Sequence, residues 1–276
     1  MRKSRPAGLV SGVATDSGLS GGDAQQDGVS VWLAGSYSGN ENTSASNGFD
    51  GHVFNLQTGM DFEVSPRLIT GLSVGSTTIK LKNVGTTGGK YDEHSYSVVP
   101  YAQYQIDDMV TLGALAGYAF GDVDQTNGAT GATSNTNSSM WFMAARGGMD
   151  VDVDELTQVT TRFGASYMSK GINGFTDSSG NVNASVNNNK TYSLSIGSEA
   201  RRKIVIDSGV VVPYLGADYM LDFKDRTNND KDALMLSTGM RADFDNGFYC
   251  TLDFSSQLGR TDYSSWTAGG RAGINF

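Results

Sequence analysis

The last eleven residues, Trp266 to Phe276, constrain the fold more than any other stretch of the chain. Every second side chain is apolar or small, with aromatic rings at both ends of the series, and the residues between them are mostly polar and include Arg271. Strict period-two alternation predicts a β-strand whose two faces lie in different environments. Such a strand suits an outer-membrane β-barrel with lipid outside and water inside. It suits a half-buried strand of a soluble β-sandwich equally well.

The same alternation begins near Val29 and continues to the C-terminus in about twelve segments. At about 12–16 residues, most of these segments are longer than the roughly 5–6 residues of an ordinary globular strand. They fit tilted strands that cross the membrane and extend beyond it. The predicted strands are residues 29–38, 49–64, 68–82, 91–106, 109–123, 139–153, 157–170, 189–205, 209–224, 232–244, 248–259 and 266–276.

The connections between these segments alternate in length, which a soluble sandwich has no reason to do. Tight turns are predicted at 65–67, 107–108, 154–155, 207–208 and 245–247, and long loops at 39–48, 83–90, 124–137, 171–188 and 225–231. Outer-membrane barrels show this sorting, with short periplasmic turns and longer external loops. Backbone groups in hydrocarbon must all be paired, so the sheet must close. We therefore predict an all-β fold, a 12-stranded antiparallel transmembrane β-barrel spanning residues 27–276, in the bacterial outer membrane.

Charged residues within the strands fall on the polar face, where the barrel would enclose its lumen. A charge on the lipid face would cost about 2–4 kcal/mol at mid-membrane. We expect a wet lumen of mixed charge, in which these residues serve solvation and cross-strand pairing. Glycines on the same face, such as Gly59, Gly117 and Gly239, would widen the lumen locally. The predicted lumen-facing residues are Arg146, Arg162, Glu199, Arg201, Asp218, Arg241, Asp243, Asp253 and Arg271.

Composition excludes several other classes of protein. The formal net charge is -9 and no basic patch dominates, so nucleic acid is not an expected partner. No run of about 18 apolar residues indicates a membrane-spanning helix. The single cysteine, Cys250, excludes an internal disulfide and a cysteine-rich metal site. We predict no catalytic residue, no metal and no cofactor.

The N-terminal residues 1–26 are rich in glycine and small polar residues, which predicts a flexible linker upstream of the barrel. Met1 to Arg5 is basic, as the start of a signal peptide would be, but no apolar segment follows. A barrel must first cross the inner membrane, so its precursor needs a signal peptide. We expect the chain to be a mature or excised C-terminal piece of a longer precursor.

Three stretches resemble the β-domain of autotransporters, the translocators of type V secretion. They are FDGHVFNLQTGMDFEVSPRLITGLSVGSTTIKLK (49–82), SYSVVPYAQYQIDDMVTLGALAGYAFGDVD (95–124) and AGGRAGINF (268–276). The resemblance covers residues from about 28 to 276. It implies a twelve-stranded barrel that exports and anchors an N-terminal passenger at the cell surface, with the linker threading the lumen. The family's linker usually forms a helix, whereas residues 1–26 are glycine-rich and poor helix formers.

The resemblance also implies partners and an assembly signal. The partners would be outer-membrane lipid, the barrel-assembly machinery, periplasmic chaperones and a covalently linked passenger. The terminal strand, with Trp266, Ile274 and above all Phe276, would be the signal that the assembly machinery reads.

Two other functions remain open from the residues alone. The barrel could be a channel or porin. It could also be a membrane-embedded hydrolase that uses His52 or His94, which are expected at the external strand ends beside Asp50 and Asp92. No G-x-S-x-G context frames a nucleophilic serine, so the histidines are interpreted as solvated residues of the rim.

Overall fold

The computed structural model describes residues 28–45, 48–183, 186–223 and 231–276. The side chains of residues 186–189 are also left out of the description. The predicted linker, residues 1–26, lies outside the described residues. Within the described ranges, no helix is long and apolar enough to cross a membrane.

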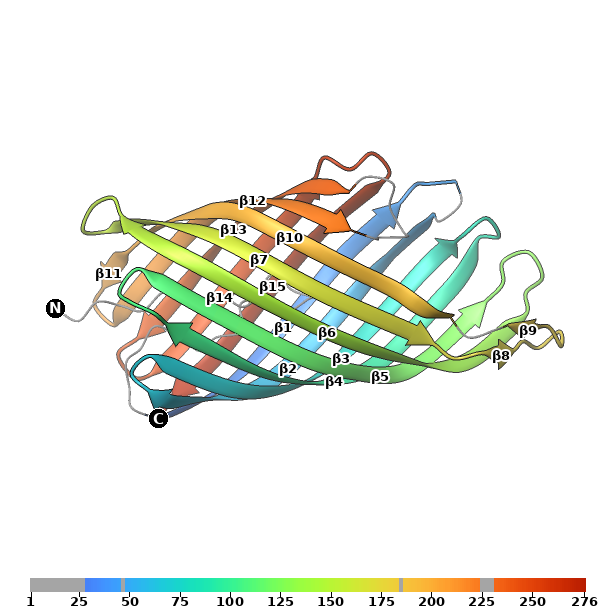
Figure 1. The fold of residues 1–276 in the computed structure, drawn as a ribbon, viewed down its shortest axis with the longest axis horizontal. Coiled ribbons are helices and arrows are strands. Elements are labelled where there is room, and N and C mark those ends of the chain that lie inside the picture. The colour runs from blue at the N-terminus through green and yellow to red at the C-terminus, as the bar shows by residue number, and fades with distance from the viewer. Residues whose placement is uncertain (1–27, 46–47, 184–185, 224–230) are drawn as a thin grey trace.

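The described chain is a closed antiparallel barrel of twelve strand positions (Figure 1). Neighbours in sequence pair with each other, β15 pairs with β1, and β10 pairs with β12 to complete the ring. The short β11 continues the position of β10, and β8 and β9 form a small separate hairpin. The strands are β1 (Val29–Asn42), β2 (Phe49–Ser65), β3 (Leu68–Val84), β4 (Gly89–Gln105), β5 (Val110–Thr126), β6 (Thr133–Asp152), β7 (Thr157–Ile172), β8 (Phe175–Thr176), β9 (Val182–Asn183), β10 (Val186–Arg202), β11 (Ile204–Ile206), β12 (Gly209–Phe223), β13 (Asp232–Phe244), β14 (Phe248–Leu258) and β15 (Tyr263–Asn275).

The alternation of the sequence becomes the two faces of the wall. On β1, Leu33 is 54% exposed and points to the lipid side, whereas its neighbour Trp32 is 2% exposed and points into the lumen. Large apolar side chains are exposed at alternate positions along the other long strands as well. The predicted fold class, a 12-stranded antiparallel barrel, is confirmed.

Both ends of the described chain lie at the same end of the barrel, beside the tight turns (Figure 1). The backbone N–H of Phe276 donates to the carbonyl of Val29, so the last residue is tied to the first strand.

Two of the tight turns are stabilised by aspartate side chains. Asp107 Oδ1 accepts hydrogen bonds from the N–H groups of Met109 and Val110, both at 2.8 Å. Asp154 repeats this arrangement in the β6–β7 turn, where backbone N–H donors lower the pKa of its carboxyl.

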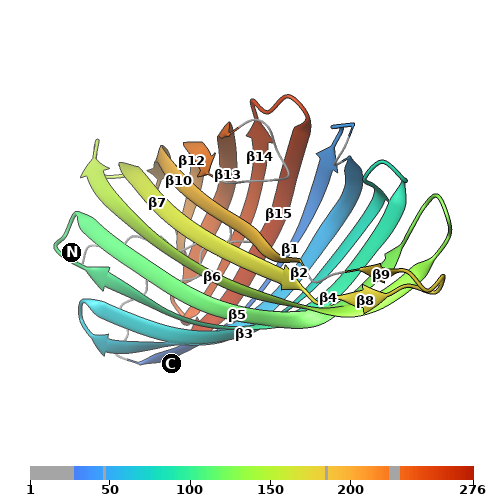
Figure 2. The same cartoon turned by 45° about the vertical axis from the view of Figure 1, so that its right-hand side comes forward.

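The long loops lie at the opposite end (Figure 2), and the four that follow β1, β3, β5 and β7 are shorter than predicted. The predicted loop 124–137 is wrong at both ends, because β5 continues to Thr126 and β6 starts at Thr133, which leaves residues 127–132 as the loop. Backbone pairing in a hairpin needs no apolar side chain, so a Thr/Asn/Gly stretch extends the sheet beyond the membrane. The predicted loop 171–188 likewise contains the β8–β9 hairpin.

Proline explains why one strand position is divided into β10 and β11. Their common partner β12 pairs up to Arg201–Tyr214 and resumes at Ile204–Val211 in the same register. Pro213 lies in the interruption and has no N–H to donate to the ladder. The predicted continuous strand 189–205 is therefore broken at this point.

Pro100 interrupts β4 in the same way. Pairing with β5 stops at Val98–Tyr118 and resumes at Tyr101–Leu115 without a change of register, while Pro100 keeps its place opposite β3. A closed barrel thus accommodates a mid-strand proline at the cost of a short gap in one ladder.

Aromatic rings on the lipid face contact one another in series and form what we call the aromatic girdle. Its contacting members are Phe254, Trp266 and Tyr37, then Tyr96, Phe120, Tyr118 and Trp141, and then Tyr167 and Tyr192. Toward the long loops, the exposed outward positions become charged, as at Lys80, Asp92 and Asp122. Aromatic residues mark the membrane interface in such barrels. The hydrocarbon region therefore lies between the girdle and the tight turns.

Candidate functional site: the lumen

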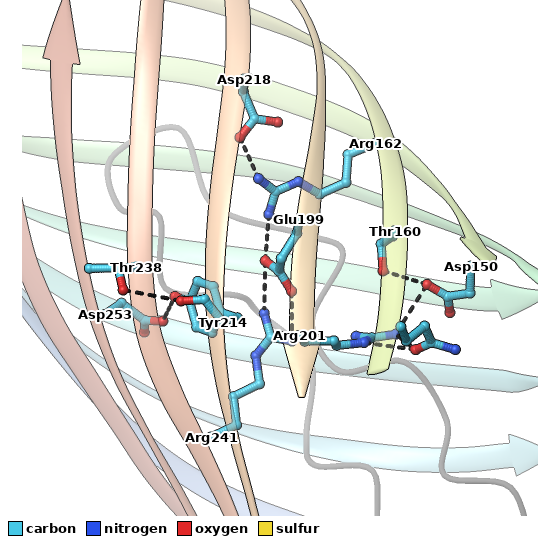
Figure 3. Close-up of polar contacts among 11 residues, drawn as sticks. Asp150, Thr160, Arg162, Glu199, Arg201, Tyr214, Asp218, Thr238, Arg241 and Asp253 are labelled. Carbon is cyan, nitrogen blue, oxygen red and sulfur yellow. Dashed lines mark hydrogen bonds and ion pairs between the residues drawn. The ribbon is translucent and has the colours of Figure 1, made fainter. Parts of the chain in front are cut away.

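One wall of the lumen carries a network of ion pairs centred on Glu199 of β10 (Figure 3). Its carboxylate pairs with Arg162 from β7 at 2.7 Å and with Arg241 from β13 at 3.1 Å. Arg162 also pairs with Asp218 of β12. Glu199 is 3% exposed, so both arginines depend on a carboxylate that is shielded from bulk water. We call this set, with the neighbouring pair described next, the charged wall.

The neighbouring pair lies closer to the tight turns. Arg201 Nη2 is 3.1 Å from Asp150 Oδ1, and Arg201 Nε donates to Gln158 Oε1 at 2.7 Å. Thr160 Oγ1 donates to Asp150 at 2.5 Å. These contacts connect β6, β7 and β10, so the charged wall links adjacent strands side chain to side chain as well as through the backbone.

Tyr214 of β12 extends the charged wall to β14. The Arg241 guanidinium lies 4.6 Å from the centre of the Tyr214 ring, a cation–π contact. The Tyr214 hydroxyl donates to Asp253 of β14.

A second cluster, the aromatic wall, lies at the seam between the first and last strands. The Arg271 guanidinium lies 4.1 Å from the Trp32 ring centre and 3.4 Å from Asp61 Oδ2. Trp32 Nε1 donates to Tyr101 Oη at 3.0 Å and to Asp61 at 3.2 Å, and Tyr101 donates to Asp61. Tyr249 completes the cluster from β14, with its ring centre 5.7 Å from the guanidinium. Arg271 is thus buried among aromatic rings and pairs with Asp61.

Aromatic rings of the lumen lie against glycines of neighbouring strands. A Cβ built on Gly59 would be 2.5 Å from the Trp32 ring, and one on Gly71 would be 2.2 Å from Tyr101. The expectation that these lumenal glycines widen the lumen is wrong where a ring occupies the space. The other inward pairs are Phe142 on Gly117, Tyr214 on Gly239 and Tyr249 on Gly273.

Two further ion pairs lie nearer the external end. Lys170 of β7 pairs with Glu93 of β4, which also accepts from Ser138 at 2.7 Å. Arg260 pairs with Asp222 of β12. Glu93 and Asp222 are on the predicted polar face of their strands, but sequence alone offered no partner for them, because β4 and β7 are not adjacent.

The lumen also contains apolar side chains, in addition to the mixed charges that the sequence predicted. Val99, Leu115 and Phe142 are buried on the inward face of β4, β5 and β6, and Met140 and Met168 pack against them. Their inward positions follow from strand parity, but they were not among the predicted lumen-facing residues.

The predicted lumen-facing residues alternate with exposed apolar residues on their strands. Seven of the nine take part in the contacts above, whereas Arg146 and Asp243 are half-buried on the same inward parity. Trp266, Ile274 and Phe276 are exposed on the opposite, lipid-facing side, Phe276 by 68%.

The two histidines lie outside the lumen. His94 contacts Thr78 Oγ1 at 3.1 Å and Tyr96 Oη at 3.0 Å, and His52 stacks on Tyr37. Both are at the level of the aromatic girdle. No group of three or more His, Cys, Asp or Glu residues that could hold a metal ion occurs in the described part of the chain.

Known proteins resemble the chain in sequence pattern and in fold. The family model for the autotransporter β-domain matches residues 31–269. The translocator domain of the autotransporter NalP from Neisseria meningitidis has a TM-score of 0.75 and 16% identity, over 91% of this chain and 90% of that chain. No curated protein sequence gives a significant match.

Two further solved structures share the architecture. The β-domain of the Bordetella autotransporter BrkA has a TM-score of 0.79 and 16% identity, over 91% of this chain and 100% of that chain. The transport unit of the autotransporter AIDA-I from Escherichia coli has a TM-score of 0.73 and 16% identity, over 91% of both chains. The family match covers most of a closed twelve-position barrel with a lipid-facing apolar band, and the chain therefore belongs to the autotransporter β-domain family, as an outer-membrane barrel that translocates a passenger.

Proposed function

We propose that the chain anchors and exports a passenger polypeptide joined covalently at its N-terminal side. In this proposal, residues 27–276 form the barrel domain and residues 1–26 the linker. The match to the β-domain family over residues 31–269 carries the proposal. A twelve-stranded barrel is wider than the side-chain-filled eight-stranded barrels and narrower than open porins, so one polypeptide segment suits its lumen.

The charged lumen residues serve the barrel, in this proposal, and not the cargo. Arg162 of β7 and Arg241 of β13 both form ion pairs with Glu199 of β10, which lies between them. Charges that are already paired offer a passing chain little net attraction, so the exported segment is not retained. This assigns a structural role to the lumen charges and makes the passenger's own sequence unimportant for transit.

Surface display tests this function. A signal peptide and a protease-sensitive reporter are fused in front of residue 1, and protease is added to intact cells. We expect cleavage of the reporter from outside. A folded, outer-membrane barrel whose reporter remains protected would overturn the proposal.

The terminal strand is proposed as the signal read by the barrel-assembly machinery, with periplasmic chaperones delivering the chain. Trp266, Ile274 and Phe276 present exposed apolar side chains at alternate positions, as a docking strand would. Deletion of Phe276 should reduce assembly in cells far more than it lowers the stability of barrel refolded in detergent. An equal loss of assembly and stability would contradict the signal role.

A channel or porin is the competing function, and single-channel conductance separates the two. Removal of residues 1–26 should increase the conductance of a translocator whose linker occupies the lumen, whereas a porin should hardly change. We propose no enzymatic activity. An esterase activity of the purified barrel that disappears in His52→Ala would show otherwise.

A further inference from the structure

The lipid-facing wall carries a hollow that extends from β4 across β5, β6, β7 and β10 to β12, where Leu194 and Leu221 belong to its lining. The hollow has a volume of about 810 Å³. Its floor consists of Ala102, Ala114, Ala145 and Ala165, which are direct cross-strand neighbours in one row. Four methyl groups side by side place the floor close to the backbone over a width of about 14 Å, three strand spacings.

Large side chains border the groove on the side of the tight turns. In the next outward row, Tyr104 is opposite Leu112, and Phe163 follows on β7. The position between them on β6 is Gly147, and the Phe163 ring lies over it. These side chains, not the alanines by themselves, make the surface concave.

The opposite side of the groove is open over β4 and β5. There the outward residues are Pro100 and Ala116, which are both small. The groove is therefore closed toward the periplasmic turns and accessible from the direction of the aromatic girdle. The girdle residues Tyr118 of β5 and Trp141 of β6 are each the second outward residue along the strand from the alanine floor.

The depth of the groove determines what kind of molecule it can hold. It lies between the aromatic girdle and the tight turns, in the hydrocarbon region. The side chains of its floor carry no polar atom, and the backbone groups beneath them are paired in the sheet. The alanine floor therefore offers a head group no hydrogen-bonding partner, and the polar atoms of the lining belong to Tyr104, Arg146, Ser195 and Tyr219. A concave apolar surface covers more of a hydrocarbon chain than a flat wall does, and so retains it longer.

We propose that this groove is a binding site for an acyl chain of the external-leaflet glycolipid, the lipopolysaccharide class of lipid. The groove continues the lipid interface that surrounds the barrel, and its open side faces the external leaflet. Its volume falls in the range of roughly 300–1,000 Å³ typical of small-molecule sites. This site lies on the outer wall, so it is independent of passenger export through the lumen.

Native mass spectrometry tests the proposal on the full-length chain. The barrel is refolded in detergent micelles that contain equal amounts of lipid A and phosphatidylethanolamine, and the lipids that remain bound are identified. Ala145→Phe fills the groove. Ala217→Phe places the same ring on an exposed, outward position of β12 beyond the groove lining and is the matched control. Heat-modifiable gel mobility verifies folding, and Ala114→Leu replaces Ala145→Phe if that variant does not fold.

We expect the wild type and Ala217→Phe to retain lipid A equally. Retention should fall at least about tenfold in Ala145→Phe, the effect of displacing roughly two methylene groups from apolar contact. Equal retention in all three proteins would overturn the groove as the site. Preferential retention of phosphatidylethanolamine would overturn the external-leaflet source. A barrel dimer that only Ala145→Phe abolishes would assign the groove to a second copy of the chain and likewise overturn the proposal.

Discussion

The two walls of the lumen bury arginines in different ways. On the charged wall, Glu199 forms ion pairs with both Arg162 and Arg241, so one carboxylate compensates the charge of two guanidinium groups. On the aromatic wall, Arg271 lies against the Trp32 ring and pairs with Asp61. A narrow barrel can therefore compensate a buried cation either by ion pairs between strands or by packing it against rings that also lie against glycines.

The difference has a consequence for removing single groups. Loss of a shared carboxylate takes one ion-pair partner from two cations at once, whereas loss of a ring leaves a cavity and one cation that keeps its carboxylate. Urea titration of refolded barrel in micelles, followed by heat-modifiable gel mobility, measures each case as a change in the free energy of unfolding.

Glu199→Ala should have the largest effect. It leaves Arg162 and Arg241 without their shared partner, and we expect a loss of about 4 kcal/mol in the free energy of unfolding, as for breaking a buried pair. Glu199→Gln is the control, because it keeps the side-chain shape and removes only the charge. A loss below about 1 kcal/mol in both variants would place this pair among solvent-screened surface pairs.

Trp32→Ala should come next, with a loss of about 3 kcal/mol from the cavity over Gly59 and the lost cation–π contact. Trp32→Phe keeps an aromatic ring but removes the Nε1–H donor to Tyr101 and Asp61. If the ring on the glycine dominates, Trp32→Phe should recover more than half of the loss. A Phe variant as unstable as the Ala variant would assign the effect to the hydrogen bonds.

Gly59→Ala should destabilise by about 2 kcal/mol, because the added Cβ meets the Trp32 ring and the Leu72 carbonyl. Gly35→Ala is matched to it: Gly35 lies on β1 facing lipid, and its nearest atom to an added Cβ is 3.7 Å away. It should change stability by less than about 0.5 kcal/mol. Similar effects in both would show that strand glycines act through the unfolded chain instead.

Asp218→Ala should have the smallest effect of the series, about 1 kcal/mol, because its side chain is 20% exposed and Arg162 keeps Glu199. The loss should shrink further at 1 M salt, where the Debye length is about 3 Å. Insensitivity to salt would mean that this carboxylate is as shielded as Glu199.

Much of the fold follows from the sequence, because period-two alternation and loop parity are local signals. They predicted the twelve strand positions. The extension of β5 and β6 over residues 124–137 could not be predicted in the same way, since hairpin pairing of polar residues leaves no apolar pattern.

The contacts inside the lumen were less predictable, since they depend on register and curvature. Lys170 and Glu93 meet across two intervening strands, and no spacing in the sequence encodes that distance. The pairing of Trp32 with Gly59 follows once the β1–β2 register is known, because these residues are directly opposite. Sequence alone offered neither register nor barrel shape.

Photo-crosslinking of a passenger during export tests the central claim most directly. A photoreactive residue is placed at Gln57, which faces the lumen, and in a second variant at its neighbour Leu56, which is exposed to lipid. With a reporter fused before residue 1, a translocator predicts adducts between barrel and reporter from position 57 and none from position 56. A reporter that reaches the surface without any adduct from position 57, or with adducts from position 56 instead, would contradict transport through this lumen.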